Sequence, residues 1–346
     1  MKKSARRALV LSAALLVAGQ IQAGNPQRSG SAGASELLIN PWARNTGWGG
    51  VNIAGVEGVE ASFLNIAGTA QTKRTDVAFT STQWLVGGGI NISAAGFNQK
   101  VGSNGVLGAS FVGLDYGEWE RTTVDNPDGG IGTINPSAVT IGISYAQKFT
   151  ESIYGGVNIK LFSQASDNLS VNALCFDAGV QYITGKDKQL KFGITLKNVG
   201  PSVSYSGNGK GVNLTVPQGG YVQAYDERSA TFELPTNLSL GGSYDFIFDS
   251  QVLTFAAAFQ SNSFEKDQYI VGAQYMVKEI VGVRVGYTIQ DNRVYEQRTS
   301  VFTGLSAGAT LAVPLGDSGT KFGLDYSYRA TNPFNGVHSI GIQFML

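Results

Sequence analysis

Apolar and polar side chains alternate with a period of two along most of the chain, and the alternation is clearest near its end, in residues 321–346. There Ile340 and Phe344 fall on one face, while Gly341 and Gln343 fall on the other. A period of two predicts a β-strand. One apolar, aromatic face and one small or polar face are typical of a membrane β-barrel, which turns the first to lipid and the second to its lumen.

The same alternation recurs from residue 76 onward and predicts about fourteen strands. The strand-like segments span 76–84, 87–97, 105–117, 137–148, 151–164, 172–184, 189–199, 237–247, 251–262, 267–278, 280–291, 301–313, 319–330 and 337–346. Connections after even-numbered segments are short, whereas the long connections, 118–136, 200–236 and 292–300, follow odd-numbered segments. Bacterial barrels have short periplasmic turns and long outer loops. The predicted fold class is therefore all-β, a transmembrane antiparallel β-barrel over residues 76–346.

The residues before this region lack the lipid-facing alternation and divide into three predicted segments. Residues 1–23 combine a basic start, a short apolar run and a small final residue, which predicts a secretory signal peptide. Residues 24–36 are rich in Gly and Ser and are predicted to be flexible. Residues 37–75 are the predicted N-terminal plug, with a short helix over 57–67, because a barrel this wide is not filled by its own strand side chains.

Composition supports a secreted barrel. Charged residues make up 14% of the chain, against about a quarter in a typical soluble domain. The chain beyond the signal peptide offers no uninterrupted apolar stretch of about 18 residues that could form a membrane helix. Four of the 25 basic residues and none of the 25 acidic residues lie in residues 1–23, which leaves the remainder near −4 and does not suggest a nucleic-acid partner. The predicted location is the bacterial outer membrane, with outer-membrane lipid as the first partner.

Three short motifs resemble a known family. They lie at 37–67, where Ala43-Arg44, Asn65 and Ala67 belong to the pattern while Ile66 replaces the usual proline, at 196–201 (LKNVGP) and at 324–338. Together they resemble the PorV/PorQ family of outer-membrane barrels, which are related in fold to FadL, the long-chain fatty-acid transporter. The resemblance implies a FadL-like barrel of about fourteen strands with an N-terminal plug.

The resemblance also implies a function in the type IX secretion system of Bacteroidetes. Members of the family bind secreted cargo, or belong with the translocon and the attachment complex, so the expected partners are proteins of these three kinds. The alternative is a FadL-like outer-membrane transporter of hydrophobic small molecules. This alternative predicts an apolar pocket beside the plug and a gap in the barrel wall.

The sequence shows no catalytic constellation, so no enzyme activity, cofactor or metal site is predicted. The chain has one histidine, His338, which rules out a site built from several histidines. Its one cysteine, Cys175, excludes an internal disulfide and is expected to face inward as an inert residue.

Charged residues at inward positions serve either as a hydrated lumenal wall or as anchors for the plug. Arg44 lies in the predicted plug between Trp42 and Trp48, and it is expected to form a latch with a wall carboxylate. Asp177 and Asp325 are the candidates for that carboxylate. A contact with a partner or a ligand is the alternative role for this group.

The long connection 200–236 carries the candidates for partner binding. Tyr205, Tyr221 and Tyr225 lie there among Gly, Ser and Asn residues. Tyrosine supplies contact area at a low cost in side-chain entropy, which suits protein recognition. An ordinary loop that packs over the barrel mouth explains the same residues, and the sequence leaves both interpretations open.

Overall fold

The computed structural model describes residues 28, 30–123, 125–207, 209, 211–217, 219–290, 293–294, 297–298, 300–316 and 319–346. The predicted signal peptide, residues 1–23, lies outside the described residues. The segment predicted to be flexible, residues 24–36, is described at residue 28 and over 30–36.

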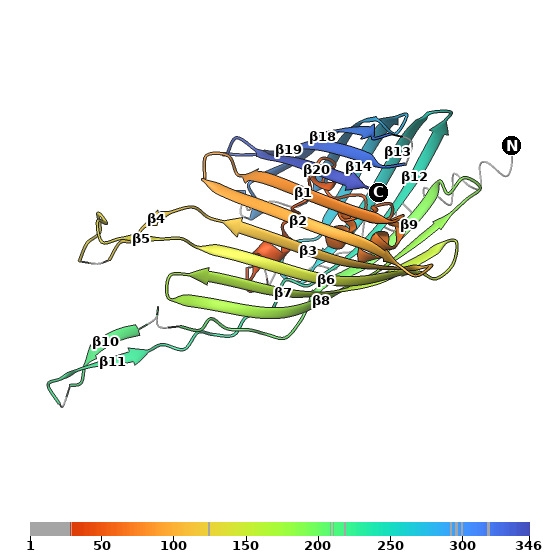
Figure 1. Cartoon of the computed structure of the whole chain (residues 1–346). Coiled ribbons are helices and arrows are strands. Elements are labelled where there is room, and N and C mark those ends of the chain that lie inside the picture. Colours follow the sequence, from red (N-terminus) through yellow and green to blue (C-terminus); the bar gives the residue numbers. More distant parts are fainter. Residues whose placement is uncertain are drawn as a thin grey trace.

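Fourteen antiparallel strands form a closed barrel (Figure 1). They are β1 (Thr75–Trp84), β2 (Ile90–Val101), β3 (Gly105–Asp115), β6 (Ser137–Lys148), β7 (Ile153–Ser166), β8 (Leu169–Thr184), β9 (Leu190–Val199), β12 (Asn237–Phe248), β13 (Gln251–Asn262), β14 (Gln268–Val277), β15 (Val281–Ile289), β18 (Phe302–Pro314), β19 (Lys321–Thr331) and β20 (Val337–Met345). Each strand pairs with the next, and β1 pairs with β20, where Phe79 lies opposite Ile342. The predicted fold class and the predicted strand number are confirmed.

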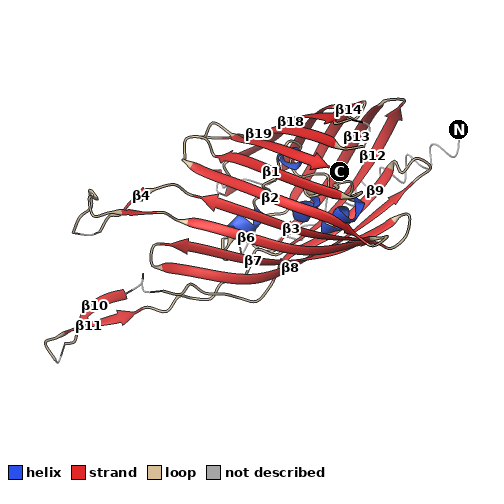
Figure 2. Ribbon diagram, in the orientation of Figure 1, coloured by secondary structure: helices blue, strands red, loops and turns tan. Residues whose placement is uncertain are grey.

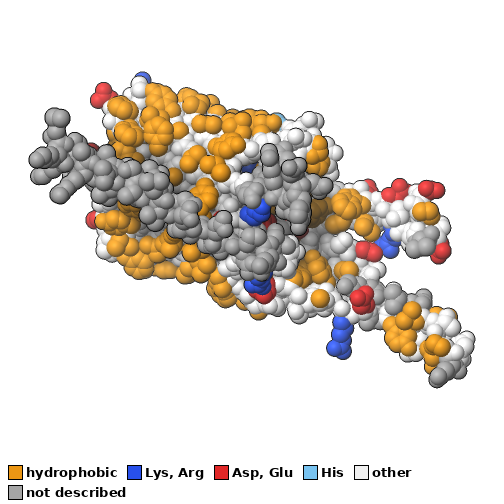
Figure 3. Space-filling model, turned by 180° about the vertical axis from the view of Figure 1, so that it is seen from behind, with side chains coloured by type: hydrophobic (Ala, Val, Ile, Leu, Met, Phe, Trp, Pro, Cys, Tyr) orange, Lys and Arg blue, Asp and Glu red, His pale blue; other side chains and the backbone are white. Residues whose placement is uncertain are grey.

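The alternation along each strand separates an apolar outer face from a polar inner face. Ile143 and Val283 on the outer face are 65% and 53% exposed, whereas their inward neighbours Ser144 and Arg284 are 6% and 4% exposed. Figure 3 shows hydrophobic side chains over much of the visible outer wall. Ring closure leaves no unpaired sheet edge, as a lipid environment requires, so the outer wall is suited to a bilayer.

The two ends of the barrel differ as the loop lengths predicted. The long connections carry three small hairpins, β4 (Trp119–Glu120) with β5 (Thr133–Ile134), β10 (Gly211–Thr215) with β11 (Val222–Asp226), and β16 (Arg293–Val294) with β17 (Gln297–Arg298). The first two hairpins project from the same end of the barrel (Figure 1). We call this the outer end. The short turns and both the start of β1 and the end of β20 lie at the opposite, inner end.

Residues 30–74 occupy much of the barrel interior and include four short helices (Figure 2). These are the 3-10 helix η2 (Ser35–Leu38), the α-helices α2 (Ala43–Thr46) and α3 (Ala61–Leu64), and the 3-10 helix η3 (Ile66–Gln71). The single helix predicted over 57–67 is therefore replaced by α3 and the start of η3. None of the helices in the described residues is long and apolar enough to cross a membrane.

This N-terminal segment has two parts, which we name separately. The plug, residues 41–72, lies deep in the barrel, where Trp42 and Ala43 are 1% and 0% exposed. The strap, residues 30–40, lies against the outer half of the wall. Its Ala34 is 4% exposed and belongs to a cluster of buried apolar side chains, so the packed segment begins before the predicted boundary at Leu37.

Candidate functional site

Glycines on the inner wall let the backbone of the plug approach the strands closely. A Cβ atom on Gly193 of β9 would lie 2.5 Å from the carbonyl oxygen of Ile53. A Cβ atom on Gly286 of β15 would overlap the backbone carbonyl of Trp48. Such approaches exclude any larger side chain at these positions. The abundance of inward glycine thus has a physical reason, which is the fit between wall and plug.

An ion-pair cluster fixes α2 of the plug to β19. The Arg44 guanidinium donates from Nε to Asp325 Oδ1 at 3.0 Å and from Nη2 to Asp325 Oδ2 at 3.1 Å. Arg284 of β15 lies 3.5 Å from the same carboxylate and donates to the Arg44 carbonyl oxygen at 3.1 Å. Thr310 of β18 donates a further hydrogen bond to Asp325. The structure therefore places Arg44 and Asp325 together as the predicted latch.

A second carboxylate, Glu60, adjoins this cluster from within the plug. Its Oε1 atom accepts a hydrogen bond from the Arg44 backbone N–H at 3.3 Å. Burial disfavours the ionised form more than the neighbouring Arg44 favours it, and the pKa of Glu60 rises to about 7. The plug thus contains an acid that changes its charge near neutral pH.

The other predicted latch residue, Asp177, does not contact Arg44. It pairs with Lys160 of the neighbouring strand at 2.7 Å and accepts the Asn198 backbone N–H at 2.8 Å. The register between β8 and β9 shifts beside it, which marks a bulge. Asn198 in turn donates to the Leu37 carbonyl oxygen at 3.5 Å. Asp177 therefore supports the strap through Asn198. It does not contact Arg44, although it was one of the two candidate partners of that residue.

Both tryptophans beside Arg44 pack between the plug and the wall. Trp42 is 1% exposed and belongs to a cluster with Val59 and Ala78, while Trp48 is 2% exposed and packs near Val51. These contacts fill the space around the latch. Because both rings are buried, neither ring presents a free surface to a ligand.

A second attachment of the plug was missed by sequence reasoning. Asn65 is 0% exposed, and its Nδ2 atom donates to the carbonyl oxygens of Ile53 at 3.0 Å and Val180 at 3.1 Å. Gln181 of β8 donates to the carbonyl oxygen of Val56 at 2.9 Å. The sequence signal that could have revealed this attachment was Gln181, an amide side chain at an inward position of a clearly alternating strand.

A cavity of about 980 Å³ lies between the plug, the strap and the outer half of the wall. Its lining is mixed, with apolar side chains from Leu38, Phe63, Trp84, Ile90, Ile270 and Phe302 among polar ones. The pocket expected of a small-molecule channel is thus present. The expected gap in the wall is absent from the described residues, because strand pairing continues around the whole ring, with shifts of register at β8–β9 and β18–β19.

Two cations line this cavity without a counter-ion in hydrogen-bonding contact among the described residues. Lys197 is 5% exposed and lies 4.2 Å above the centre of the Phe63 ring in the plug. Arg329 lies 4.0 Å above the centre of the Phe302 ring. Stacking on aromatic faces offsets part of the cost of removing these charges from water. The cavity therefore combines apolar surface with charged groups, which are Lys197, Lys266 and Arg329 together with the carboxylates of Glu36 and Glu265.

The three candidate tyrosines separate into two groups. Tyr205 packs on Phe232 and donates a hydrogen bond to Gln164 at 2.7 Å, so it belongs to the barrel mouth. Tyr221 and Tyr225 are 57% and 44% exposed on the β10–β11 hairpin. The interpretation as a packed loop therefore applies to Tyr205, and the two other tyrosines remain available for a partner.

No protein-family model and no curated protein matches the sequence. Solved structures share the fold. The toluene transporter TodX of Pseudomonas putida has a TM-score of 0.56 at 10% identity over 88% of this chain and 97% of its own. The toluene transporter TbuX of Ralstonia pickettii has a TM-score of 0.52 at 12% identity over 88% and 97%. A Pseudomonas aeruginosa FadL homologue has a TM-score of 0.51 at 12% identity over 87% and 96%.

These likenesses show that the fold is that of the FadL-type outer-membrane barrels. At such low identity they show the fold and nothing more. The neighbours are transport channels by their own descriptions. None of them supports the resemblance to the PorV/PorQ family or a place in type IX secretion.

Proposed function

We propose that the chain is a FadL-like channel of the bacterial outer membrane that takes up hydrophobic small molecules through the cavity above its plug. The observation that carries the proposal is the cavity of about 980 Å³ inside a closed, plugged barrel. Ligand sites are typically concave and largely apolar, with a few polar groups that orient the ligand, and pockets of roughly 300–1,000 Å³ are usual. The fold shared with hydrocarbon transporters supports the same assignment.

The plug explains how such a channel excludes bulk solutes. Its backbone approaches the wall at glycine positions, and it is held by the Arg44–Asp325 pair at one side and by Asn65 and Gln181 at another. These attachments are polar and enclosed, and the apolar contacts of Trp42 and Trp48 with the wall add to them. A molecule in the cavity therefore meets a closed floor until the plug moves.

Uptake of the fluorescent probe N-phenylnaphthylamine by a deletion strain tests the proposal. Thr288 of β15 lines the cavity, whereas its neighbour Tyr287 is 48% exposed on the outer wall. Thr288→Trp should obstruct part of the cavity and reduce uptake relative to the complemented strain. Tyr287→Trp adds a similar side chain on the opposite face of the same strand and should leave uptake unchanged. Equal uptake by the deletion strain and the complemented strain would count decisively against the channel.

A second candidate function is a component of the type IX secretion system that binds translocon, attachment-complex or cargo proteins. The specific observation in its favour is the projecting β10–β11 hairpin, where Leu214, Tyr221 and Val222 are 52%, 57% and 64% exposed. Exposed apolar side chains grouped on one element are typical of protein-binding surfaces. Affinity purification from native membranes, with and without residues 211–226, tests this candidate. Recovery of the same proteins with both forms, or of none of these proteins, would eliminate it.

A further inference from the structure

The strap is held at the outer end of the barrel by contacts from several elements. Its Gly33 N–H donates to the carbonyl oxygen of Glu233, 3.2 Å away, and Ala32 forms a parallel bridge with the same residue. Gly30 N–H donates to the carbonyl oxygen of Phe264 at 3.3 Å. Glu233 belongs to the long connection before β12, and Phe264 to the turn before β14. The strap therefore runs along the outer rim of the lumen.

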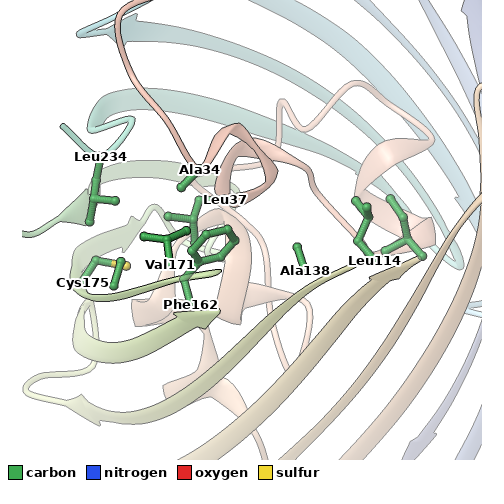
Figure 4. Packing of buried hydrophobic residues seen from close by; sticks show 10 residues of the cluster. Ala34, Leu37, Leu114, Ala138, Phe162, Val171, Cys175 and Leu234 are labelled. Atoms are coloured by element: carbon green, nitrogen blue, oxygen red, sulfur yellow. The ribbon is translucent and has the colours of Figure 1, made fainter. Parts of the chain in front are cut away.

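Apolar side chains seat the strap against the wall on one side only. Figure 4 shows Ala34 and Leu37 pointing toward Phe162, Val171 and Leu234. The opposite side of the strap borders the cavity, whose lining includes the residues at positions 30, 35, 36 and 38–40. The strap thus forms one wall of the cavity, at the end that faces the outer loops.

One carboxylate connects the strap to both the barrel and the long loop. Glu36 Oε1 accepts a hydrogen bond from the Tyr116 hydroxyl and another from Gln164 Nε2 at 2.8 Å. The Tyr205 hydroxyl donates to Gln164 Oε1 at 2.7 Å. Burial, followed by the adjoining Glu36 carboxylate, raises the pKa of Tyr116 well above its usual value, which keeps this hydroxyl protonated as a donor. Hydrogen bonds to a charged acceptor are about twice as strong as neutral ones.

The backbone of the strap differs from that of the plug. Ala34, which precedes η2, has a φ of 54° and a ψ of 41°, the left-handed region that alanine rarely adopts. Such a conformation persists only when surrounding contacts hold it, and it is common at switching segments. Asn40, at the junction with the plug, has an amide nitrogen that is buried without a hydrogen-bond partner. Ala34 within the strap and Asn40 at its junction with the plug therefore both carry local costs that movement would relieve.

We propose that the strap is a gate for the outer side of the cavity. Glu36 fastens this gate to the wall, and the long connection 200–236 keeps the gate closed through Tyr205 and Gln164. The β10–β11 hairpin belongs to that same connection, so an event at the hairpin can reach the gate through the chain. The proposal rests on the cavity and not on the identity of the molecule that passes. It concerns the outer end of the lumen, whereas the Arg44–Asp325 pair holds its floor.

Thiol labelling in native outer membranes tests the gate without a transport substrate. The reporter is Thr288→Cys, which places a thiol in the cavity, and the probe is a membrane-impermeant maleimide. The parent, whose Cys175 is 0% exposed, gives the blank. Glu36→Ala should raise the labelling rate at least tenfold, and Glu36→Gln should fall between it and the parent. Tyr205→Phe should also raise the rate, because it removes the hydrogen bond to Gln164.

A matched control and a locked form make the result decisive. Glu118→Ala removes another acid at the outer end, one that bonds Thr133 and not the strap, and should leave the rate unchanged. A disulfide between Ala32→Cys and Glu233→Cys should slow labelling and cancel the effect of Glu36→Ala until it is reduced. An unchanged rate in a folded Glu36→Ala protein, or fast labelling in the locked form, would overturn the gate. Either outcome leaves the proposed channel standing, since its test reads uptake.

Discussion

Removal of the Asp325 charge should loosen the plug more than any other single conservative change in the wall. Asp325 is 2% exposed and is the shared partner of Arg44 and Arg284. Asp325→Asn keeps the shape but leaves the buried Arg284 and the partly buried Arg44 with Glu60 and, for Arg44, Glu57 as the remaining acidic neighbours. Breaking a buried pair by removing one partner costs about 3–5 kcal/mol. The plug-released state should therefore gain population by roughly a hundredfold to several thousandfold.

Hydrogen exchange of the plug amides and conductance in planar bilayers both measure this change. In the parent, residues 43–68 should exchange slowly and the barrel should conduct few ions. Asp325→Asn should speed exchange in that segment while the strands stay protected, and it should produce openings in the conductance record. The double variant Asp325→Asn with Arg44→Met should lose less plug stability than the sum of the losses in the two single variants. The difference should be about 0.5–3 kcal/mol, because the two residues interact directly.

Asp167→Asn provides the control for the loss of a carboxylate. Asp167 pairs with Arg121 at the outer end, where the two side chains are 34% and 38% exposed. Exposed pairs contribute about 0–1 kcal/mol, so this variant should match the parent in both assays. If Asp325→Asn also matched the parent, with the same exchange over 43–68 and the same conductance, the latch would not hold the plug and the reasoning from burial would be wrong.

Further predictions concern the fit between plug and wall, the pH dependence of plug opening, and the polarity of the cavity. Gly286→Val should displace the plug at Trp48, at a cost of about 1–3 kcal/mol from overpacking, and should raise conductance; Gly242→Val, whose nearest side-chain atom would be 3.7 Å away, should not. Because the pKa of Glu60 is raised to about 7, its contribution to plug stability is full below about pH 4.5 and is lost as pH rises to 7. Exchange over 43–68, corrected for the intrinsic rate, should therefore show more frequent opening at pH 7.5 than at pH 4.5, and Glu60→Gln should flatten this dependence. Lys197→Met should strengthen binding of a neutral fluorescent probe and weaken binding of its carboxylate analogue by about tenfold, measured by titration of the purified protein; equal shifts for both probes would refute a role for its charge.

The barrel could be predicted from sequence because the alternation of apolar and polar residues along a strand directly indicates its two faces. Residues such as Ile143 and Ser144 alternate over many strands, with a few apolar inward positions such as Phe162 and Val171, and the loop lengths alternate independently of them. That Arg44 pairs with a wall carboxylate was also predictable, because a charge in a mostly apolar plug needs a wall partner. The choice between Asp325 and Asp177 was not, since it depends on which strands α2 lies against, and these are β18, β19 and β20.

Other features of the site depend on contacts that join distant parts of the chain. Asn65 meets the carbonyl oxygen of Val180, which is 115 residues away, and only the register of the barrel brings them together. Residues 24–36 were predicted to be flexible from their Gly and Ser content, yet Ala34 packs in a buried cluster with side chains of β7, β8 and the long connection. The cavity has no sequence signature of its own, because its lining comes from residues scattered over nine barrel strands and the N-terminal segment.

Equilibrium binding of N-phenylnaphthylamine to the purified protein in detergent tests the central claim most directly. The account predicts saturable fluorescence enhancement with one site per chain, weakened at least tenfold by Thr288→Trp and unchanged by Tyr287→Trp. Binding that is not saturable, or that is equally strong in both variants, would show that the cavity above the plug does not receive hydrophobic molecules.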